Sequence, residues 1–174
     1  MKRIQLTLNG EQRDLEVAET ALLLDVLRDQ CGLFSVREAC GVGQCGTCTV
    51  LVDGRPLSSC LLLAGLQHGR SVETLEGLSR NGELHPIQAA FLEHEACQCG
   101  YCTPGFVLSV KALLEEQPNP SPDEVREYLA GNLCRCGAYP EILKATAAAS
   151  ARLRATPNEL EQSGGQHDAA QDHD

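Results

Sequence analysis

A glycine-rich stretch with three closely spaced cysteines constrains this chain more than any other feature. Residues 37–50 read REACGVGQCGTCTV, and a fourth cysteine follows after a gap of eleven residues. The spacing is C-x4-C-x2-C, and the four residues are Cys40, Cys45, Cys48 and Cys60. Three thiols on one loop and a fourth on a neighbouring segment are the ligand pattern of a plant-type [2Fe–2S] cluster. Glycines between the cysteines let the backbone reach positive φ, curl around a small inorganic core and point N–H groups at its sulfur atoms: Gly41, Gly43 and Gly46.

Two other sites use similar cysteine patterns. Structural zinc sites usually pair two short C-x2-C knuckles, whereas a longer step filled with glycine suits something larger than one ion. A redox-active C-x-x-C of the thioredoxin type would use only Cys45 and Cys48 and would leave Cys40 and Cys60 without a role. The spacing therefore favours the cluster over both alternatives.

A second set of cysteines lies in the C-terminal half of the chain. Cys99 and Cys102 occur in QCGYCTPG, Cys134 and Cys136 occur in NLCRCG, and each pair stands just before a predicted helix. If these helices belong to an antiparallel bundle, both loops open at the same end and the four thiols can converge. The positive ends of the helix dipoles would then favour thiolates. Spacing alone leaves a four-cysteine zinc site open here, but a chain with one redox cluster has a use for a second.

The pattern of apolar residues divides the chain into two domains. In residues 1–78, apolar residues alternate with polar ones on both sides of Asn9-Gly10, which predicts a hairpin. Thr20 is predicted to cap a helix that runs to about Gln30. Further strands are predicted at residues 49–52, 57–62 and 72–75. This is an α+β unit of the β-grasp type. Residues 79–154 predict an all-α domain of four short helices. The first helix runs until Cys97, the second opens with Thr103 as N-cap and Pro104, the third opens with Ser121-Pro122-Asp123-Glu124, and the fourth runs from near Pro140 to about Arg154.

Composition limits the remaining possibilities. The acidic, serine- and glycine-containing residues 155–174 predict a disordered tail, and a net charge of −10 argues against nucleic acid as a partner. No apolar run is long enough to span a membrane, and a start without an apolar signal segment predicts the cytoplasm. The two remaining cysteines, Cys31 and Cys97, are expected to be small buried residues. No nucleophile triad, paired carboxylates or phosphate loop occurs, so no residue is predicted to be catalytic.

Four segments in one order resemble a known family: CGVGQCGTC, LHPIQAAF, QCGYCTPG and GNLCRC. From about Ile4 to Lys144 the chain is similar to the iron–sulfur small subunits of the molybdenum hydroxylases, the group of xanthine oxidase and aerobic carbon monoxide dehydrogenase. The resemblance implies a ferredoxin-like domain followed by a four-helix domain. It also implies one [2Fe–2S] cluster on Cys40, Cys45, Cys48 and Cys60, and another on Cys99, Cys102, Cys134 and Cys136.

The resemblance also implies a role and partners. In such enzymes a large subunit holds molybdopterin and hydroxylates the substrate, and a medium subunit with FAD often takes the electrons onward. The chain would carry electrons from molybdopterin through both clusters to the flavin or another acceptor, with Gln98 and Cys136 in contact with the pterin. A free-standing ferredoxin-like shuttle is the alternative. Residues 134–140 read CRCGAYP where many members have C-R-C-T-G-Y, which puts the form of the wall facing the large subunit in question.

Overall fold

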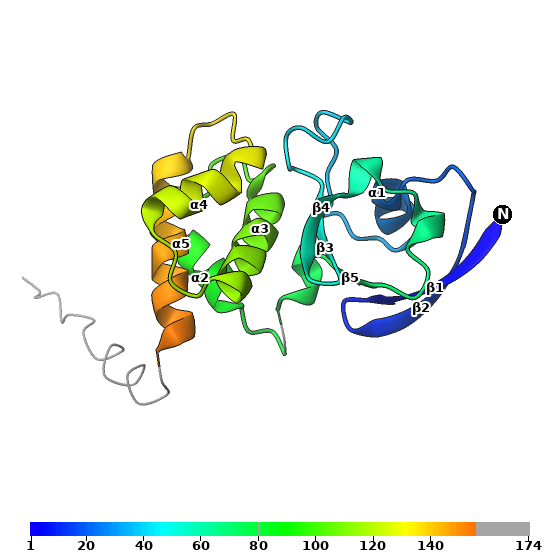
Figure 1. Ribbon diagram of the computed structural model, residues 1–174, viewed down its shortest axis with the longest axis horizontal. Helices are drawn as coiled ribbons and strands as arrows, with labels where there is room; N and C mark the ends of the chain where they lie inside the picture. The colour runs from blue at the N-terminus through cyan, green and yellow to red at the C-terminus, as the bar shows by residue number, and fades with distance from the viewer. Residues whose placement is uncertain (80, 156–174) are drawn as a thin grey trace, which may run out of the picture.

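The computed structural model describes residues 1–79 and 81–155, which form a small sheet domain and a helical domain (Figure 1). Within these residues, one five-stranded sheet has the order β2-β1-β5-β3-β4. Hairpin partners are antiparallel, and β5 runs parallel to β1 and antiparallel to β3. The strands are β1 Lys2–Leu8, β2 Glu11–Val17, β3 Thr49–Val52, β4 Arg55–Ser58 and β5 Ser71–Glu73. The first hairpin is confirmed, with positive φ at Asn9 and Gly10 as a type I′ turn requires.

The helix of the sheet domain starts later than predicted. It consists of α1, Leu23–Asp25, which continues directly into the π-helical turn η1, Val26–Gln30. The prediction of Thr20 as its cap is wrong: Leu22 is the N-cap, and no side chain caps the helix. The reason is that the Leu23 N–H donates to the Leu62 carbonyl at 2.7 Å, which keeps this part of the chain extended until Leu23.

The segment that carries Cys60 also differs from its predicted form. It was predicted to be strand, but β4 ends at Ser58, and Cys60 lies in the 3-10 turn η2, Ser59–Leu61. The Ser59 hydroxyl and N–H both donate to the Cys48 carbonyl, at 2.8 and 3.2 Å. Such local side-chain bonds compete with strand pairing and turn the chain. The two bonds from Ser59 hold the turn, and with it Cys60, beside Cys48 of the cysteine loop.

Four α-helices follow within the described residues, as predicted, although two of their ends differ from prediction. Ser121 and Glu124 form the predicted capping box. Cys102, not Thr103, is the N-cap of the second helix, because the backbone is already helical there and the Phe106 N–H donates to the Cys102 carbonyl. The first helix stops short of Cys97 because Glu95 turns the chain with a positive φ. The helices are α2 Pro86–Glu93, α3 Thr103–Glu116, α4 Pro122–Tyr128 and α5 Tyr139–Arg154.

Each domain has its own apolar core, and β3 contributes to both. Val50 and Val52 pack in the core of the sheet domain, whereas Leu51, on the opposite face of the strand, packs with the helices of the second core. Alternate side chains of a strand point to opposite faces, so a strand buried on both faces reads as a continuous apolar run. The helical domain therefore covers one face of the sheet beside the cysteine loop.

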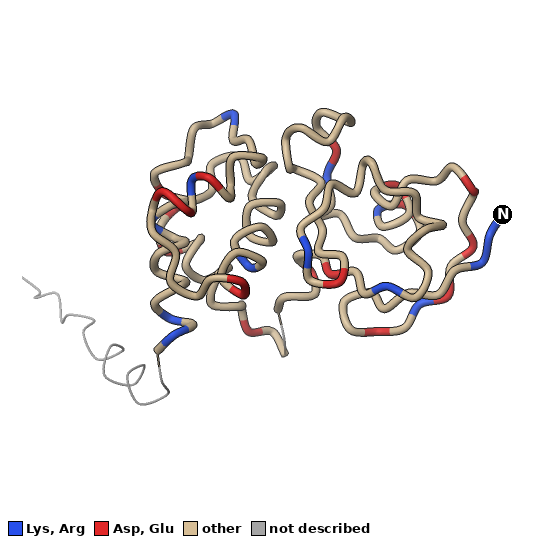
Figure 2. The backbone as a smooth tube through the Cα atoms, in the orientation of Figure 1, with Lys and Arg blue, Asp and Glu red and all other residues tan. Residues whose placement is uncertain are grey.

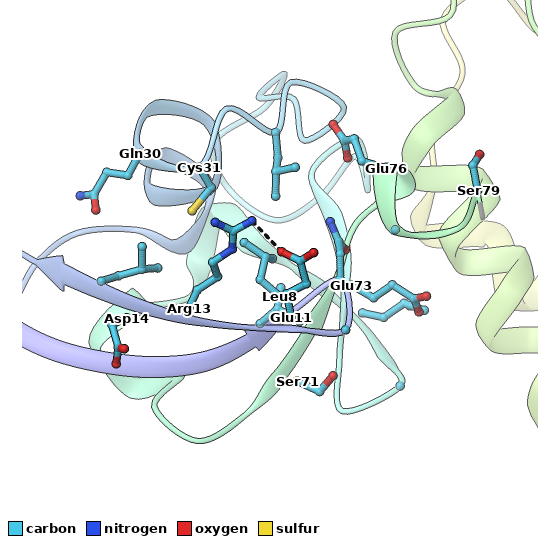
Figure 3. Close-up of a pocket in the computed structure, with 18 residues that line it drawn as sticks. Leu8, Glu11, Arg13, Asp14, Gln30, Cys31, Ser71, Glu73, Glu76 and Ser79 are labelled. Atoms are coloured by element: carbon cyan, nitrogen blue, oxygen red, sulfur yellow. Dashed lines mark hydrogen bonds and ion pairs between the residues drawn. The ribbon is translucent and has the colours of Figure 1, made fainter. Parts of the chain in front are cut away.

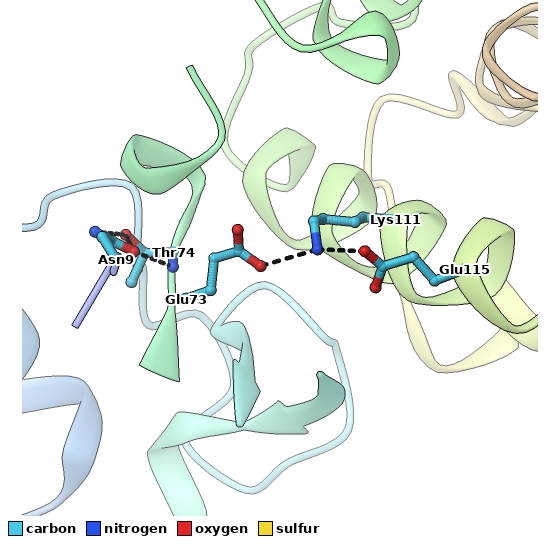
Figure 4. A network of polar contacts seen from close by, with 5 residues as sticks. All are labelled: Asn9, Glu73, Thr74, Lys111 and Glu115. Carbon is cyan, nitrogen blue, oxygen red and sulfur yellow. Dashed lines mark hydrogen bonds and ion pairs between the residues drawn. The ribbon is translucent and has the colours of Figure 1, made fainter. Parts of the chain in front are cut away.

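Polar contacts reinforce this junction (Figure 4). The Lys111 ammonium of α3 lies 3.0 Å from a Glu73 carboxylate oxygen of β5 and 2.7 Å from one of Glu115. On the sheet side, the Asn9 amide donates to the Thr74 hydroxyl at 3.0 Å and accepts from the Thr74 N–H at 2.8 Å. In the part of the chain that the structure describes, no helix is both long and apolar enough to cross a membrane.

Candidate metal centres

The first cysteine loop has the backbone form that its glycines suggested. Its three glycines have φ of 64°, 71° and 67°, at Gly41, Gly43 and Gly46 respectively. The loop points donors inward: the Gln44 N–H lies 3.4 Å from the Cys40 sulfur. Donation to Cys40 by the Val42 N–H, together with the Cys45 thiol, lowers the pKa of the Cys40 thiol to about 6. The loop is thus built to stabilise negative charge on sulfur.

Cys60 reaches the same place from the η2 turn. Burial, followed by the adjacent Cys48 side chain, raises the pKa of its thiol to about 11. The Gly43 N–H also donates to Cys60, and Cys40 is close enough to interact with it electrostatically. The thiols of the first set therefore lie close together as two pairs, Cys40 with Cys45 and Cys48 with Cys60.

The second set meets in the same two-by-two arrangement. Cys99 contacts Cys136, Cys102 contacts Cys134, and Cys134 interacts electrostatically with Cys99. The loops before α3 and α5 thus open at one end of the bundle. In Figure 1 these loops and the first cysteine loop lie along the same side of the molecule.

Burial and backbone donors divide the thiols of the second set. Donation by the Tyr101 N–H, followed by the Cys136 thiol, lowers the pKa of Cys99, whereas burial raises that of Cys102 to about 12. Burial acts to raise the pKa of Cys134, but backbone donors, led by the Ala138 N–H, outweigh it and leave the pKa lowered. In each pair, a thiol with a lowered pKa therefore faces a thiol with a raised pKa: Cys99 faces Cys136, and Cys134 faces Cys102.

The donor sets fit iron–sulfur clusters better than single ions. Among residues 1–79 and 81–155, no three His, Cys, Asp or Glu side chains are grouped so that they could hold one metal ion. A [2Fe–2S] cluster does not need such a group, because its four protein thiolates are shared between two irons. Two pairs of thiols, surrounded by N–H donors and glycine backbone, match that requirement in both sets.

Several contacts join the two loops directly. The Leu133 N–H donates to the Cys45 carbonyl at 2.9 Å, and the buried Asn132 amide donates to the Gly46 carbonyl at 3.2 Å. A Cβ on Gly105 would stand 2.2 Å from the Gly46 carbonyl oxygen. Leu133 directly precedes Cys134, so its hydrogen bond to the Cys45 carbonyl links the backbone beside one cysteine of the second set to a cysteine of the first set.

Sequence reasoning missed Asn132 and Gly105. Asn132 stands inside the GNLCRC segment and Gly105 inside QCGYCTPG, but neither has a periodicity or spacing that identifies its partner. Gly46 was assigned to the cluster loop on conformational grounds. The structure adds a second reason, because a Cβ at Gly46 would stand 2.5 Å from the Asn132 amide nitrogen.

Gln98 and Cys136 lie together on the exposed edge of the second set. The Gln98 amide donates to the Cys136 carbonyl at 3.5 Å, and both residues are exposed. Of the two unassigned cysteines, Cys31 is half-buried, but the expectation that Cys97 is buried is wrong. Cys97 follows the turn at Glu95, beyond the end of α2, and its side chain is exposed there.

A recess without the cysteines of either set lies elsewhere, beside the first hairpin (Figure 3). It measures about 840 Å³ and is lined by strand and loop residues that include Cys31 and an ion pair between Glu11 and Arg13, 2.9 Å apart. It contains no cysteine of either set. The metal centres are therefore not part of this recess.

A β-grasp domain and a helical bundle, each bringing four thiols together, define a protein with two iron–sulfur centres. Residues 6–75 match the family model described as 2Fe-2S iron-sulfur cluster binding domain, and residues 74–147 match the [2Fe-2S] binding domain. The nicotinate dehydrogenase small FeS subunit of Eubacterium barkeri is 46% identical over 139 residues, which cover 80% of this chain and 88% of that subunit.

Solved structures give the same result. A chain of quinoline 2-oxidoreductase from Pseudomonas putida 86 is 44% identical, with a TM-score of 0.85 over 88% of this chain and 96% of that chain. Aldehyde oxidoreductase from Desulfovibrio desulfuricans also gives a TM-score of 0.85 at 44% identity, but this chain spans only 17% of its length. The chain belongs to the family of iron–sulfur small subunits of the molybdenum hydroxylases.

Membership defines the general role of the chain. It is the electron-transfer subunit of an oxidoreductase, it carries [2Fe–2S] clusters, and it performs no substrate chemistry itself. Its relatives are named as subunits of dehydrogenases. This favours a role in a complex with larger partner subunits over the role of a free-standing electron shuttle.

Proposed function

We propose that the chain carries electrons from a large molybdopterin-binding subunit to a medium FAD-binding subunit or another acceptor. Each bound [2Fe–2S] cluster supplies one reversible one-electron step. The proposal assigns four thiolates to each cluster. The first cluster would be held by Cys40, Cys45, Cys48 and Cys60, and the second by Cys99, Cys102, Cys134 and Cys136.

The observation that carries this assignment is the pairing of the thiols within each set. In each domain, four cysteines from two segments of the chain meet as two pairs, and backbone N–H groups point at several of the sulfurs. Burial of Cys48, Cys60 and Cys134 keeps water from part of each centre. The hydrogen bond from the Leu133 N–H to the Cys45 carbonyl supports a short connection between the two centres.

The exposed edge of the second cysteine set supports the proposal that the large subunit binds there. Cys99, Cys136 and Gln98 are all exposed there, so a partner surface can approach this set without any rearrangement of the bundle. We assign Gln98 and Cys136 to contact with the pterin. The FAD-binding subunit would receive electrons from the first set.

We also propose a domain boundary and a cellular location for the chain. We place the domain boundary at residues 78 and 79, supported by the two family matches, which meet at residues 74–75. The predicted disordered acidic tail, residues 155–174, lies outside the described residues apart from Ala155. None of the ten cysteines, all of which lie in the described residues, forms a disulfide, which supports a reducing compartment, the cytoplasm.

Metal analysis of single-cysteine variants tests the assignment. The chain as isolated should contain about four iron and about four sulfide per molecule and give two distinct EPR signals when reduced. Cys60→Ala should abolish only the first signal and Cys102→Ala only the second, each with loss of about two iron. The matched control is Cys97→Ala, an exposed thiol two residues from Cys99 that has no assigned role. Stoichiometric zinc, or loss of a cluster in Cys97→Ala, would contradict the assignment.

A further inference from the structure

Arg37 reaches from the first cysteine segment into the second. It stands three residues before Cys40 in the sequence, and its Nη1 donates to the Gly100 carbonyl oxygen at 2.5 Å. Its guanidinium also lies over the Tyr101 ring, 5.3 Å from the centroid. Gly100 and Tyr101 are the two residues between Cys99 and Cys102. A cation of the sheet domain is therefore fixed on the ligand loop of the helical domain.

The bond from Arg37 ends on a peptide group that also serves a cysteine. The Gly100 carbonyl and the Tyr101 N–H belong to the same planar peptide unit, and the Tyr101 N–H donates to the Cys99 sulfur. A cationic donor on the carbonyl oxygen draws electron density through the conjugated peptide and makes its N–H a stronger donor. Arg37 thus acts on the Cys99 sulfur without touching it.

The acid next to Arg37 in the sequence is Glu38, whose carboxylate lies beside Gly41 of the first cysteine loop. None of the ion pairs among the described residues includes Arg37. Residues 39–52 and 96–110, which hold most of the cysteines of both sets, contain no Lys, Arg, Asp or Glu (Figure 2). In such weakly charged surroundings a half-buried guanidinium has a large influence.

We propose that Arg37 of the sheet domain raises the reduction potential of the cluster in the helical domain through the peptide group between Gly100 and Tyr101. The proposal rests on the assignment of Cys99 as a ligand of that cluster. Reduction adds one negative charge to the centre, and stronger N–H···S donation stabilises the reduced form more than the oxidised form. Because the donor comes from the other domain, the second cluster reaches its working potential only when the domains are docked.

Arg37 is a positioning residue, so its test must separate tuning from mere attachment of the loops. The Tyr101 hydroxyl donates to the Glu38 carbonyl at 2.6 Å, a second bond between the same two segments. Tyr101→Phe removes that bond but keeps both the ring under Arg37 and the peptide group. If the contacts of Arg37 and Tyr101 only hold the two segments together, Tyr101→Phe and an Arg37 variant should change the potential of the second cluster equally.

EPR-monitored redox titration of the full chain with both clusters tests the proposal. For Arg37→Met, the ratio of reduced to oxidised second cluster at a fixed solution potential should fall about fivefold, which the 59 mV per tenfold of a one-electron couple converts to a potential about 40 mV lower. The first cluster should shift less. Arg37→Lys, which keeps a cationic donor, should recover most of the shift, and Tyr101→Phe should change the ratio less than about twofold.

The outcomes are distinguishable. Equal shifts of both clusters in Arg37→Met would indicate a simple loss of charge, and an unchanged second potential would show no coupling, so either result overturns the proposal. If Arg37→Met does not assemble, Arg37→Gln keeps an uncharged donor for the Gly100 carbonyl and should give a smaller shift in the same direction, and no shift would overturn the proposal. A wild-type chain with fewer than two EPR signals would instead refute the proposed function.

Discussion

Gly105 occupies the tightest backbone contact between the two domains. A Cβ there would stand 2.2 Å from the Gly46 carbonyl oxygen and 3.3 Å from that of Thr47, and backbone atoms cannot swing aside as a flexible side chain can. Gly105→Ala should therefore push α3 away from the first cysteine loop. Overpacking typically costs about 1–3 kcal/mol, and here only about 1 kcal/mol is regained from the better helix propensity of alanine.

Thermal unfolding of the cluster-loaded chain checks this prediction. Gly105→Ala should lower the midpoint by roughly 2–4 °C for each kcal/mol of net loss. Gly131→Ala is the matched control, because it lies in the adjacent segment, has ordinary φ, and its added Cβ would meet nothing within 4 Å. It should be neutral or slightly stabilising. Equal midpoints for the two variants would mean that the domains separate freely at this contact.

Among individual residues, the sequence identifies the cysteines but not the residues that hold the two domains together. The spacing of Cys40, Cys45 and Cys48 is local, so the pattern alone suggests what they bind. The contact of Arg37 with Gly100 spans 63 residues, and no periodicity links the two. Packing between separate segments depends on the whole fold, which a single sequence does not display.

The strand β5 and the helix α3 are joined by one cation between two carboxylates. Burial acts to lower the pKa of Lys111, but hydrogen bonds and charge attraction from Glu115 and Glu73 outweigh it and leave the pKa raised. A raised folded-state pKa means that Lys111 contributes stability that is fully present below its unfolded pKa of about 10.4 and is lost as pH rises through the folded pKa. This contribution should therefore disappear under alkaline conditions.

Lys111→Met tests the contribution of this ion pair. At pH 7 the variant should be destabilised by roughly 1–2 kcal/mol, because loss of the Lys111 ammonium leaves the half-buried Glu73 carboxylate without its partner. Above the unfolded pKa of lysine, the difference between variant and wild type should shrink. Unfolding midpoints measured from pH 8 to about 11.5 give the comparison. Arg126→Met removes an exposed ion pair of α4 and should change the midpoint little at any pH. Parallel pH profiles for Lys111→Met and wild type would contradict the prediction.

Element types follow from the sequence more reliably than element ends. The capping box at Ser121 is predictable because all of its partners lie within one helical turn. The ends at Leu23 and Cys60 are not, because the bonds that set them come from Leu62 and from Cys48. In both cases a bond to a distant segment overrides local propensity.

For the whole molecule, the two cysteine sets are joined to each other, and the proposed electron route meets the large subunit at an exposed edge of the second set. The first loop is joined to the second by the Leu133 and Asn132 bonds, and the far edge of the second set, at Cys136, faces outward. Among the described residues, the recess beside the hairpin holds no thiol of either set. The proposed conduit role predicts that the isolated chain oxidises no substrate.

Cys136→Ala in the assembled complex tests the proposed route at its exposed end. Substrate binding at the proposed partner's molybdenum centre should be largely unchanged, because Cys136 is assigned to contact the pterin and not the substrate. Changes around a metal's ligands alone cost about 10–100-fold, so loss of a proposed ligand should slow reoxidation of the partner's reduced centre by at least about tenfold. Rapid mixing with substrate separates binding and reduction from reoxidation. Cys97→Ala, a nearby exposed thiol without an assigned role, should reoxidise at the normal rate. Normal reoxidation in Cys136→Ala despite a lost second EPR signal would require electrons to leave by a path outside this chain, and the conduit role would have to be abandoned.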